Sequence, residues 1–139
     1  MIVHVHTVLC KRVLRDSTMN LISLVDCIDG LLFSEFERPA AADGVMLPAG
    51  LHIFTRWARG DAGVAEQGFG RFRIIFPDGG VSETESYTID LTATPTARID
   101  QPLQLHPFTV PGRYWHVVEL LVNGTWCEVA RVPLDLLLV

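Results

Sequence analysis

The stretch VPGRYWHVVELLVNGTWCEVARVPLDLLLV, residues 110–139, decides the fold. It contains two apolar runs on either side of Asn123-Gly124, a dipeptide that favours the two-residue turn between twisted antiparallel strands. Pro111 and Gly112 lead into the first run, and proline and glycine are typical turn residues. The sequence therefore predicts a long β-hairpin over residues 110–139.

In the rest of the chain, apolar and polar residues alternate with the two-residue period of half-buried strands. The expected strands cover residues 2–10, 21–28, 51–59, 68–76, 81–91 and 96–108. Turn signals separate several of them, most clearly PDGG at 77–80. Pro102 and Pro107 make 96–108 an edge or interrupted strand, and the acidic residues of 81–91 suit an exposed face or an edge. Residues 34–50, with two prolines and two glycines, predict an irregular connection.

These patterns predict one all-β domain. Few windows have helical periodicity, and strands do not alternate with helices. The chain has 139 residues, of which 49% are hydrophobic, enough to fill a single core. We expect an antiparallel β-sandwich of about seven to nine strands over residues 1–139.

The sequence PGRYWHVVELLVNGTW at residues 111–126 resembles the end of an immunoglobulin-like domain. In such domains a Pro-Gly step precedes a strand that opens with tyrosine, and a tight hairpin follows. The resemblance implies an immunoglobulin-like β-sandwich in which the hydroxyl of Tyr114 bonds to nearby backbone. Gly112, Asn123 and Gly124 then have structural roles in shaping the hairpin.

The whole pattern also resembles a group of small uncharacterised bacterial proteins. They begin with a strand that ends in cysteine and continue with a strand of the NLISLVDCI type, found here at residues 20–28. They finish on a PGxYxhxhxhNG hairpin, where h is an apolar residue. The resemblance implies an immunoglobulin-like sandwich and transfers no catalytic residue.

Charge and apolar patterning argue against several partners. There are 11 basic and 16 acidic residues, and the basic ones, of which Lys11 is the single lysine, form no cluster that could neutralise a run of phosphates. The N-terminal MIVHVHTVLCKRV has neither the basic start nor the cleavage site of a secretory signal. No apolar run approaches the roughly 18 residues of a membrane span. We expect a cytoplasmic protein that binds neither nucleic acid nor membrane.

The cysteines, Cys10, Cys27 and Cys127, are odd in number and each lies in an apolar segment, which favours buried reduced thiols. Cys27 and Cys127 with Trp57 invite comparison with the disulfide and core tryptophan of antibody domains. The chain lacks a clear pair of disulfide-bonding cysteines around a core tryptophan, and a cytoplasmic location argues against oxidation.

His4 and His6 are the most suggestive metal ligands, because residues two apart on a strand project to the same side. A third ligand would have to come from another histidine or from an aspartate, and no spacing selects one. The alternative is an ordinary exposed strand face with Val3 and Val5 on its opposite side. We expect no cofactor.

No catalytic signature stands out. There is no G-x-S-x-G motif, and GFGRF at 68–72 precedes a strand rather than the helix of a nucleotide-binding loop. Glu83 and Glu85 have serine and threonine neighbours, which do not provide the apolar pocket that raises a carboxyl pKa. We therefore expect a protein that is not an enzyme. A small hydrolase is the least favoured alternative, with its acids in the 34–50 connection: Glu35, Glu37 and Asp43.

Trp115 and Trp126 are the main candidates for binding. If Tyr114 points inward, Trp115 points outward, and an outward tryptophan is covered either by its own chain or by a partner. The C-terminal run is apolar on both sides, which adds Leu136 and Leu138 to the candidate surface. We expect a protein partner or self-association. The alternative is a module that binds a small molecule or carbohydrate.

Overall fold

The computed structural model describes residues 1–16, 18–19, 21–28, 30–33, 45–46, 51–103, 105–106 and 110–138. In these ranges the strands are β1 (Ile2–Asp16), β2 (Leu21–Cys27), β3 (Gly30–Phe33), β4 (Val45–Met46), β5 (His52–Arg59), β6 (Glu66–Ile75), β7 (Val81–Glu83), β8 (Tyr87–Leu91), β9 (Thr96–Pro102), β10 (Leu105–His106), β11 (Gly112–Val122) and β12 (Thr125–Leu138). The same ranges contain no helix long and apolar enough to cross a membrane.

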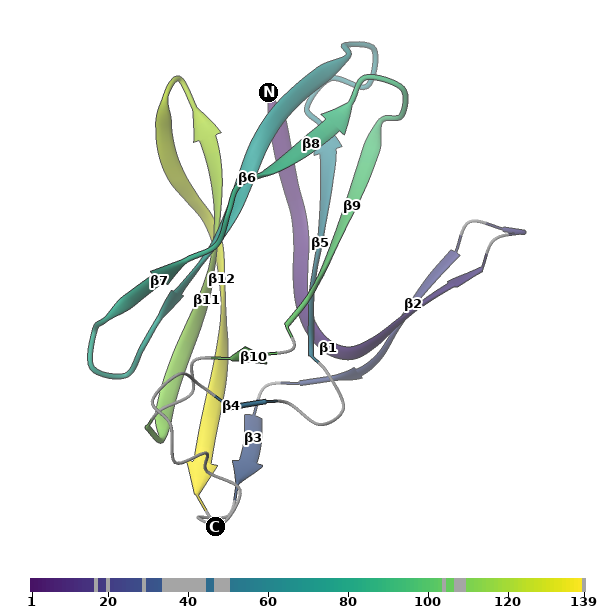
Figure 1. Ribbon diagram of the computed structural model, residues 1–139. Coiled ribbons are helices and arrows are strands. Elements are labelled where there is room, and N and C mark those ends of the chain that lie inside the picture. Colours follow the sequence, from purple (N-terminus) through teal and green to yellow (C-terminus); the bar gives the residue numbers. More distant parts are fainter. Residues whose placement is uncertain are drawn as a thin grey trace.

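Two sheets pack against each other (Figure 1). The arm sheet has the strand order β2-β1-β5-β9. The hairpin sheet has the order β3-β12-β11-β6-β7, with β8 also paired to β6. All these pairings are antiparallel except that of β3 with β12, and β4 and β10 form a small separate pair. The predicted all-β fold with two packed antiparallel sheets is confirmed. The twelve strands of the described residues do not confirm the expected number of about seven to nine.

Strand β1 is longer than the sequence predicts. It was expected to end near Cys10, but it continues to Asp16 and changes partner on the way. Its first part pairs with β5 and its second part with β2. We call the segments 10–16 and 21–27 the arm, because they extend together away from the rest of the molecule (Figure 1). Most of the arm is exposed or half-buried on both sides, so it lacks the clear alternation of a strand packed on a core.

The predicted strand over 81–91 is two strands, β7 and β8, and both pair with β6. Between them, Thr84 bonds to Phe72 of β6 through its backbone amide and through its side chain. Strand β9 lies at an edge of the arm sheet, as the prolines of its segment predict.

The terminal hairpin forms as predicted. Asn123 and Gly124 both have positive φ, at 50° and 77°, which is the backbone geometry of a two-residue turn that matches strand twist. Gly112 has a φ of 135°, and a Cβ atom there would lie 2.9 Å from the side chain of Pro77. Glycine is therefore required at this position, where the chain enters β11 beside the turn at residues 77–80.

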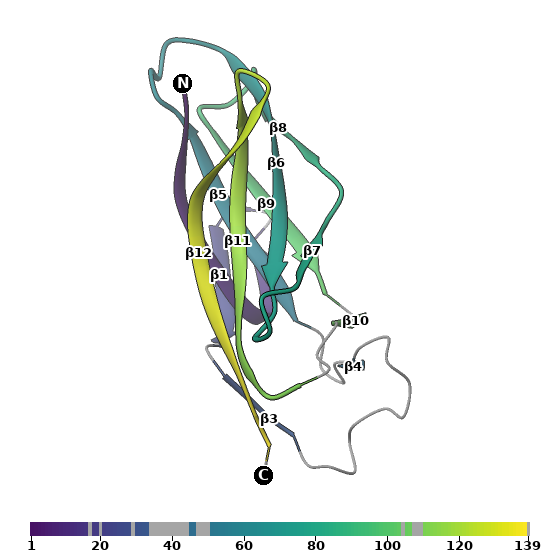
Figure 2. The same ribbon diagram turned by 90° about the vertical axis from the view of Figure 1, so that its left-hand side faces the viewer.

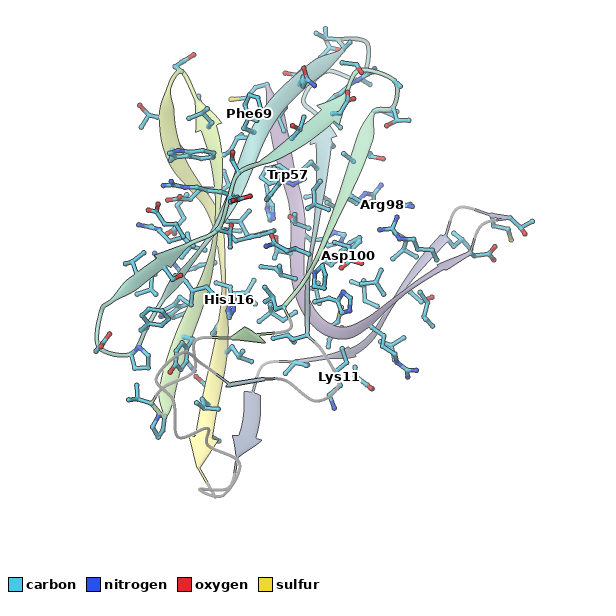
Figure 3. The ribbon with its side chains drawn as sticks, viewed as in Figure 1. Lys11, Trp57, Phe69, Arg98, Asp100 and His116 are labelled. Carbon is cyan, nitrogen blue, oxygen red and sulfur yellow. The ribbon has the colours of Figure 1, made fainter. Side chains whose placement is uncertain are left out.

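The core lies between the sheets, and Figure 3 shows Trp57 and His116 within it. Its largest fully buried side chains include Trp57, Tyr114, Phe72 and Leu9. His116 is 1% exposed, and desolvation lowers its pKa to about 4. The imidazole is therefore neutral in the core at neutral pH.

Candidate functional site

The outer face of the hairpin sheet presents Trp115. Figure 2 looks onto this face, with β11 and β12 in front. Tyr114 is fully buried, so alternation along β11 points Trp115 outward. Trp115 is half-buried and lies opposite Pro133 of β12 and Ile75 of β6, and Ile75 lies opposite Val81 of β7. We call these four side chains the apolar row, because they cross the sheet from β7 to β12.

Arginines border the apolar row. The guanidinium carbons of Arg113 and Arg131 lie 5.5 and 5.4 Å from the ring centre of Trp115. Arg113 donates two hydrogen bonds to Asp135, of 2.7 and 2.9 Å, and Arg131 donates two to Glu128, of 3.0 and 2.6 Å. These bonds lower the pKa of both carboxyl groups. Two-point pairing holds the planar guanidinium groups in fixed positions around the indole.

Trp126 closes a second charged cluster on the same face. The guanidinium of Arg71 lies over its ring, 4.4 Å from the ring centre. Arg71 Nε donates to Glu119 at 2.6 Å, and Arg71 also bonds to Glu83 at 3.2 Å. Arg73 lies 3.4 Å from the other oxygen of Glu119, which is only 4% exposed. A buried carboxylate is thus neutralised by two arginines, and each arginine on this face has a carboxylate partner.

The hydroxyl of Tyr114 anchors the start of β11. It donates a hydrogen bond to the carbonyl of Val110 at 2.6 Å and accepts one from the amide of Val110 at 3.2 Å. This is the contact with nearby backbone that the sequence resemblance implied. It fixes the chain just before the strand that carries Trp115.

The last strand differs from expectation at Leu136. This side chain is 3% exposed and belongs to the core cluster, because β12 faces the arm sheet at this position. Its burial corrects the expectation that it lies on an interaction surface. The side chain of Leu138 lies outside the described part of the structure. Leu137, on the other side of the strand, is 54% exposed, while β3 pairs with the edge of β12.

The histidine pair is separated by a β-bulge. The register between β1 and β5 shifts between His4 and His6, so the two residues do not share a side as expected. His4 packs on the core residue Trp57 with ring centres 5.3 Å apart, and its Nε2 hydrogen-bonds to Thr7 at 2.7 Å. His6 stacks instead on Phe54, at 5.9 Å. The valines at positions 3 and 5, which the alternative placed on the side opposite the histidines, are each 46% exposed.

In the residues that the structure describes, no group of three His, Cys, Asp or Glu side chains could hold a metal ion. His52 is engaged by Asp100, with Nδ1 and Oδ1 2.8 Å apart. The acids of the alternative hydrolase site fall outside the described residues: Glu35, Glu37 and Asp43.

All three cysteines are free thiols. Cys10 is buried as expected, but Cys27 and Cys127 are exposed, which corrects the expectation for these two. Cys27 lies opposite Cys10 across the arm, whereas Cys127 lies opposite Leu120 in the hairpin sheet. The pair suggested by analogy with antibody domains is therefore not formed. Burial raises the pKa of the Cys10 thiol, with a smaller effect from Cys27.

A pocket on the outer face of the arm sheet has no counterpart in the sequence-based expectations. It has a volume of about 210 Å³, and its lining includes Phe54 and Arg56 of β5 and Arg98 of β9. The alternation in LHIFTRWAR does place Phe54 and Arg56 on one side of a strand. The pairing of β5 with β9, which brings Arg98 beside them, has no local signal.

Comparison of the sequence with models of known protein families and with curated proteins finds no match.

Proposed function

We propose that this chain is a non-enzymatic β-sandwich module that acts through protein–protein contact at the outer face of the hairpin sheet. The observation that carries the proposal is the apolar row, Val81, Ile75, Trp115 and Pro133, bordered by arginines that are already paired. Protein interfaces combine an apolar centre with a polar rim, and tryptophan and arginine are enriched at their energetic hot spots.

The geometry favours recognition with little reorganisation. Arg113 and Arg131 are each held by a carboxylate through two hydrogen bonds beside Trp115. Side chains that are fixed before binding lose less conformational entropy when a partner orders them. Val81 is 49% exposed, so the apolar row still has surface to bury. The partner is a second copy of the chain or another protein.

We also infer that the sandwich is of the immunoglobulin type. The orders β1-β5-β9 and β3-β12-β11-β6-β7 correspond to strands A-B-E and A′-G-F-C-C′ of such domains. The bonds between Tyr114 and Val110 are those of a tyrosine corner. His116 stands two residues after the corner tyrosine, where antibody domains have a cysteine. The exposed thiols of Cys27 and Cys127 support a reducing compartment such as the bacterial cytoplasm.

The test compares Trp115→Gln with Val5→Gln, which changes an exposed apolar residue of the arm sheet instead. Light scattering and sedimentation of the purified chains measure self-association, and affinity capture from a bacterial lysate measures binding to another protein. Trp115→Gln should weaken the association about 30-fold or more, because a hot-spot tryptophan contributes about 2 kcal/mol. Trp126→Gln should weaken it as well, and Val5→Gln should not.

The circular dichroism spectrum and the thermal midpoint of each variant report whether the fold is intact. Association that survives both tryptophan changes in folded protein would refute the proposed surface. Equal losses in Trp115→Gln and Val5→Gln would refute it too, because they would show that binding is not specific to this face.

A further inference from the structure

The pocket on the arm sheet lies between the arm and strands β5 and β9. Its apolar wall includes Phe54 of β5 and Leu24 of β2, and its polar wall includes Arg56, Arg98 and His6. Figure 3 shows Arg98 on the side of β9 that faces the arm. Residues from four strands therefore converge on one pocket.

The polar wall places two guanidinium groups side by side. Arg56 and Arg98 are direct partners across the β5–β9 pair, so the two guanidinium groups share one face of the sheet. Like charges directly opposite each other on neighbouring strands are destabilising. The Nε atom of Arg56 is buried without a hydrogen-bond partner, and Arg56 makes no ion pair with any residue in the described ranges.

Asp100 is the nearest acidic residue on the same face of β9, and it forms no ion pair with Arg56. Asp100 stands two residues from Arg98 on the same strand and is held by His52 at 2.8 Å. The pKa of His6 is lowered, first by burial and then by the charge of Arg56. His6 is therefore neutral at neutral pH, and its imidazole can hydrogen-bond to a ligand without adding a third positive charge.

The size of the pocket limits the ligand. Its volume of about 210 Å³ compares with the cavity of about 150 Å³ that holds benzene in an engineered protein. A single ring or a short alkyl group with one acidic group fits this space. Phe54 is 2% exposed with His6 stacked on it, so it forms the floor of the pocket, while Leu21, which is 56% exposed, offers apolar surface at its side.

We propose that this pocket binds a small amphipathic anion, in which a carboxylate or phosphate lies between Arg56 and Arg98 and an apolar group packs against Phe54 and Leu24. Guanidinium groups suit this role because their planar donor arrangement matches the oxygens of both acids. The site is distinct from the outer face of the hairpin sheet and does not depend on the protein–protein contact proposed above.

Phenyl phosphate is the probe, and benzyl alcohol is its neutral counterpart with a similar ring. Isothermal titration calorimetry at low ionic strength should show saturable binding of phenyl phosphate, with a dissociation constant of about 1 mM or tighter. Added salt should weaken the binding because it screens a charge interaction. Benzyl alcohol should bind at least tenfold more weakly. Benzoate should bind as well, because its carboxylate oxygens match the donor geometry of a guanidinium group.

Arg56→Gln and Arg98→Gln should each weaken phenyl phosphate binding tenfold or more. Lys11→Gln is the matched control, because it removes one positive charge from an exposed position outside the pocket lining. Circular dichroism verifies the fold of each variant. Binding that is lost equally in all three variants would overturn the proposal, since it would reflect net charge alone. Absence of saturable binding to the unaltered chain, or equal binding of benzyl alcohol, would overturn it as well.

Discussion

The outward faces of the two sheets place arginines in opposite electrostatic settings. On the hairpin sheet, Arg71 and Arg113 each bond to carboxylates, as do the other arginines of that face. On the arm sheet, Arg56 lies directly opposite Arg98 and makes no ion pair within the described ranges. On the first face each arginine is already paired, so a partner would bind there through shape complementarity and apolar contact. On the second, the guanidinium of Arg56 has no carboxylate partner within the described ranges, which favours an anion.

This difference between the two sheets depends most on Glu119, the buried carboxylate of the hairpin sheet. Glu119→Gln leaves Arg71 and Arg73 beside a neutral amide, and we expect it to lower the free energy of unfolding by about 3 kcal/mol. Urea denaturation at pH 7 measures the loss. Glu128→Gln is the control, because its pair with Arg131 is largely exposed and should contribute less than about 1 kcal/mol. Equal losses in the two variants would show that the buried pair has no special weight.

Mild acid should lower the stability of the fold through its buried histidines before it affects the ion pairs of the hairpin sheet. The folded-state pKa of His116, about 4, lies below the ordinary 6.5, so the unfolded chain takes up its proton first as the pH falls. Stability is therefore lost between pH 6.5 and about 4, with about 2 kcal/mol lost through His116 by pH 5. The pKa values of His4 and His6 are also lowered, so these residues act in the same direction.

The arginine-paired carboxyl groups respond in a lower pH window. The pKa values of Glu128 and Asp135 are lowered from 4.5 and 3.8, so their contribution persists at pH 5. Urea denaturation at pH 7 and pH 5 should show a smaller loss in a His116→Leu chain than in the unaltered chain. An equal loss in both chains would assign the acid sensitivity to other groups.

Local signals were sufficient for the terminal hairpin. Asn123-Gly124 fixes the turn, and the buried Tyr114 then sets Trp115 outward by strand alternation. The ion pairs around Trp126 could not be predicted, because they require Arg71 of β6 to lie opposite Glu119 of β11. Register between strands distant in sequence has no signature within either strand.

The arm sheet could not be predicted from the sequence for a related reason. Alternation in IVHVHTVLC predicts that His4 and His6 share a side, but the bulge between them reverses the relation. The extension of β1 to Asp16 was also missed, because the arm is solvated and needs no apolar face. The pocket follows from both the arm and the β5–β9 pairing, so it became visible only with the tertiary structure.

The smallest expected effect is the most direct test of whether Arg56 on the arm sheet lacks a compensating charge. Without ligand, Arg56→Gln should change the free energy of unfolding by less than about 1 kcal/mol, because the lost packing is offset by relief of repulsion from Arg98. Arg71→Gln should destabilise the chain more, since it removes a partner of the buried Glu119. Urea denaturation across a salt series compares them. Salt should stabilise the unaltered chain more than Arg56→Gln, because screening relieves a repulsion that the variant lacks. If salt acts equally on both, or if Arg56→Gln is the more damaging change, Arg56 is compensated within the fold and the two faces do not differ in charge balance.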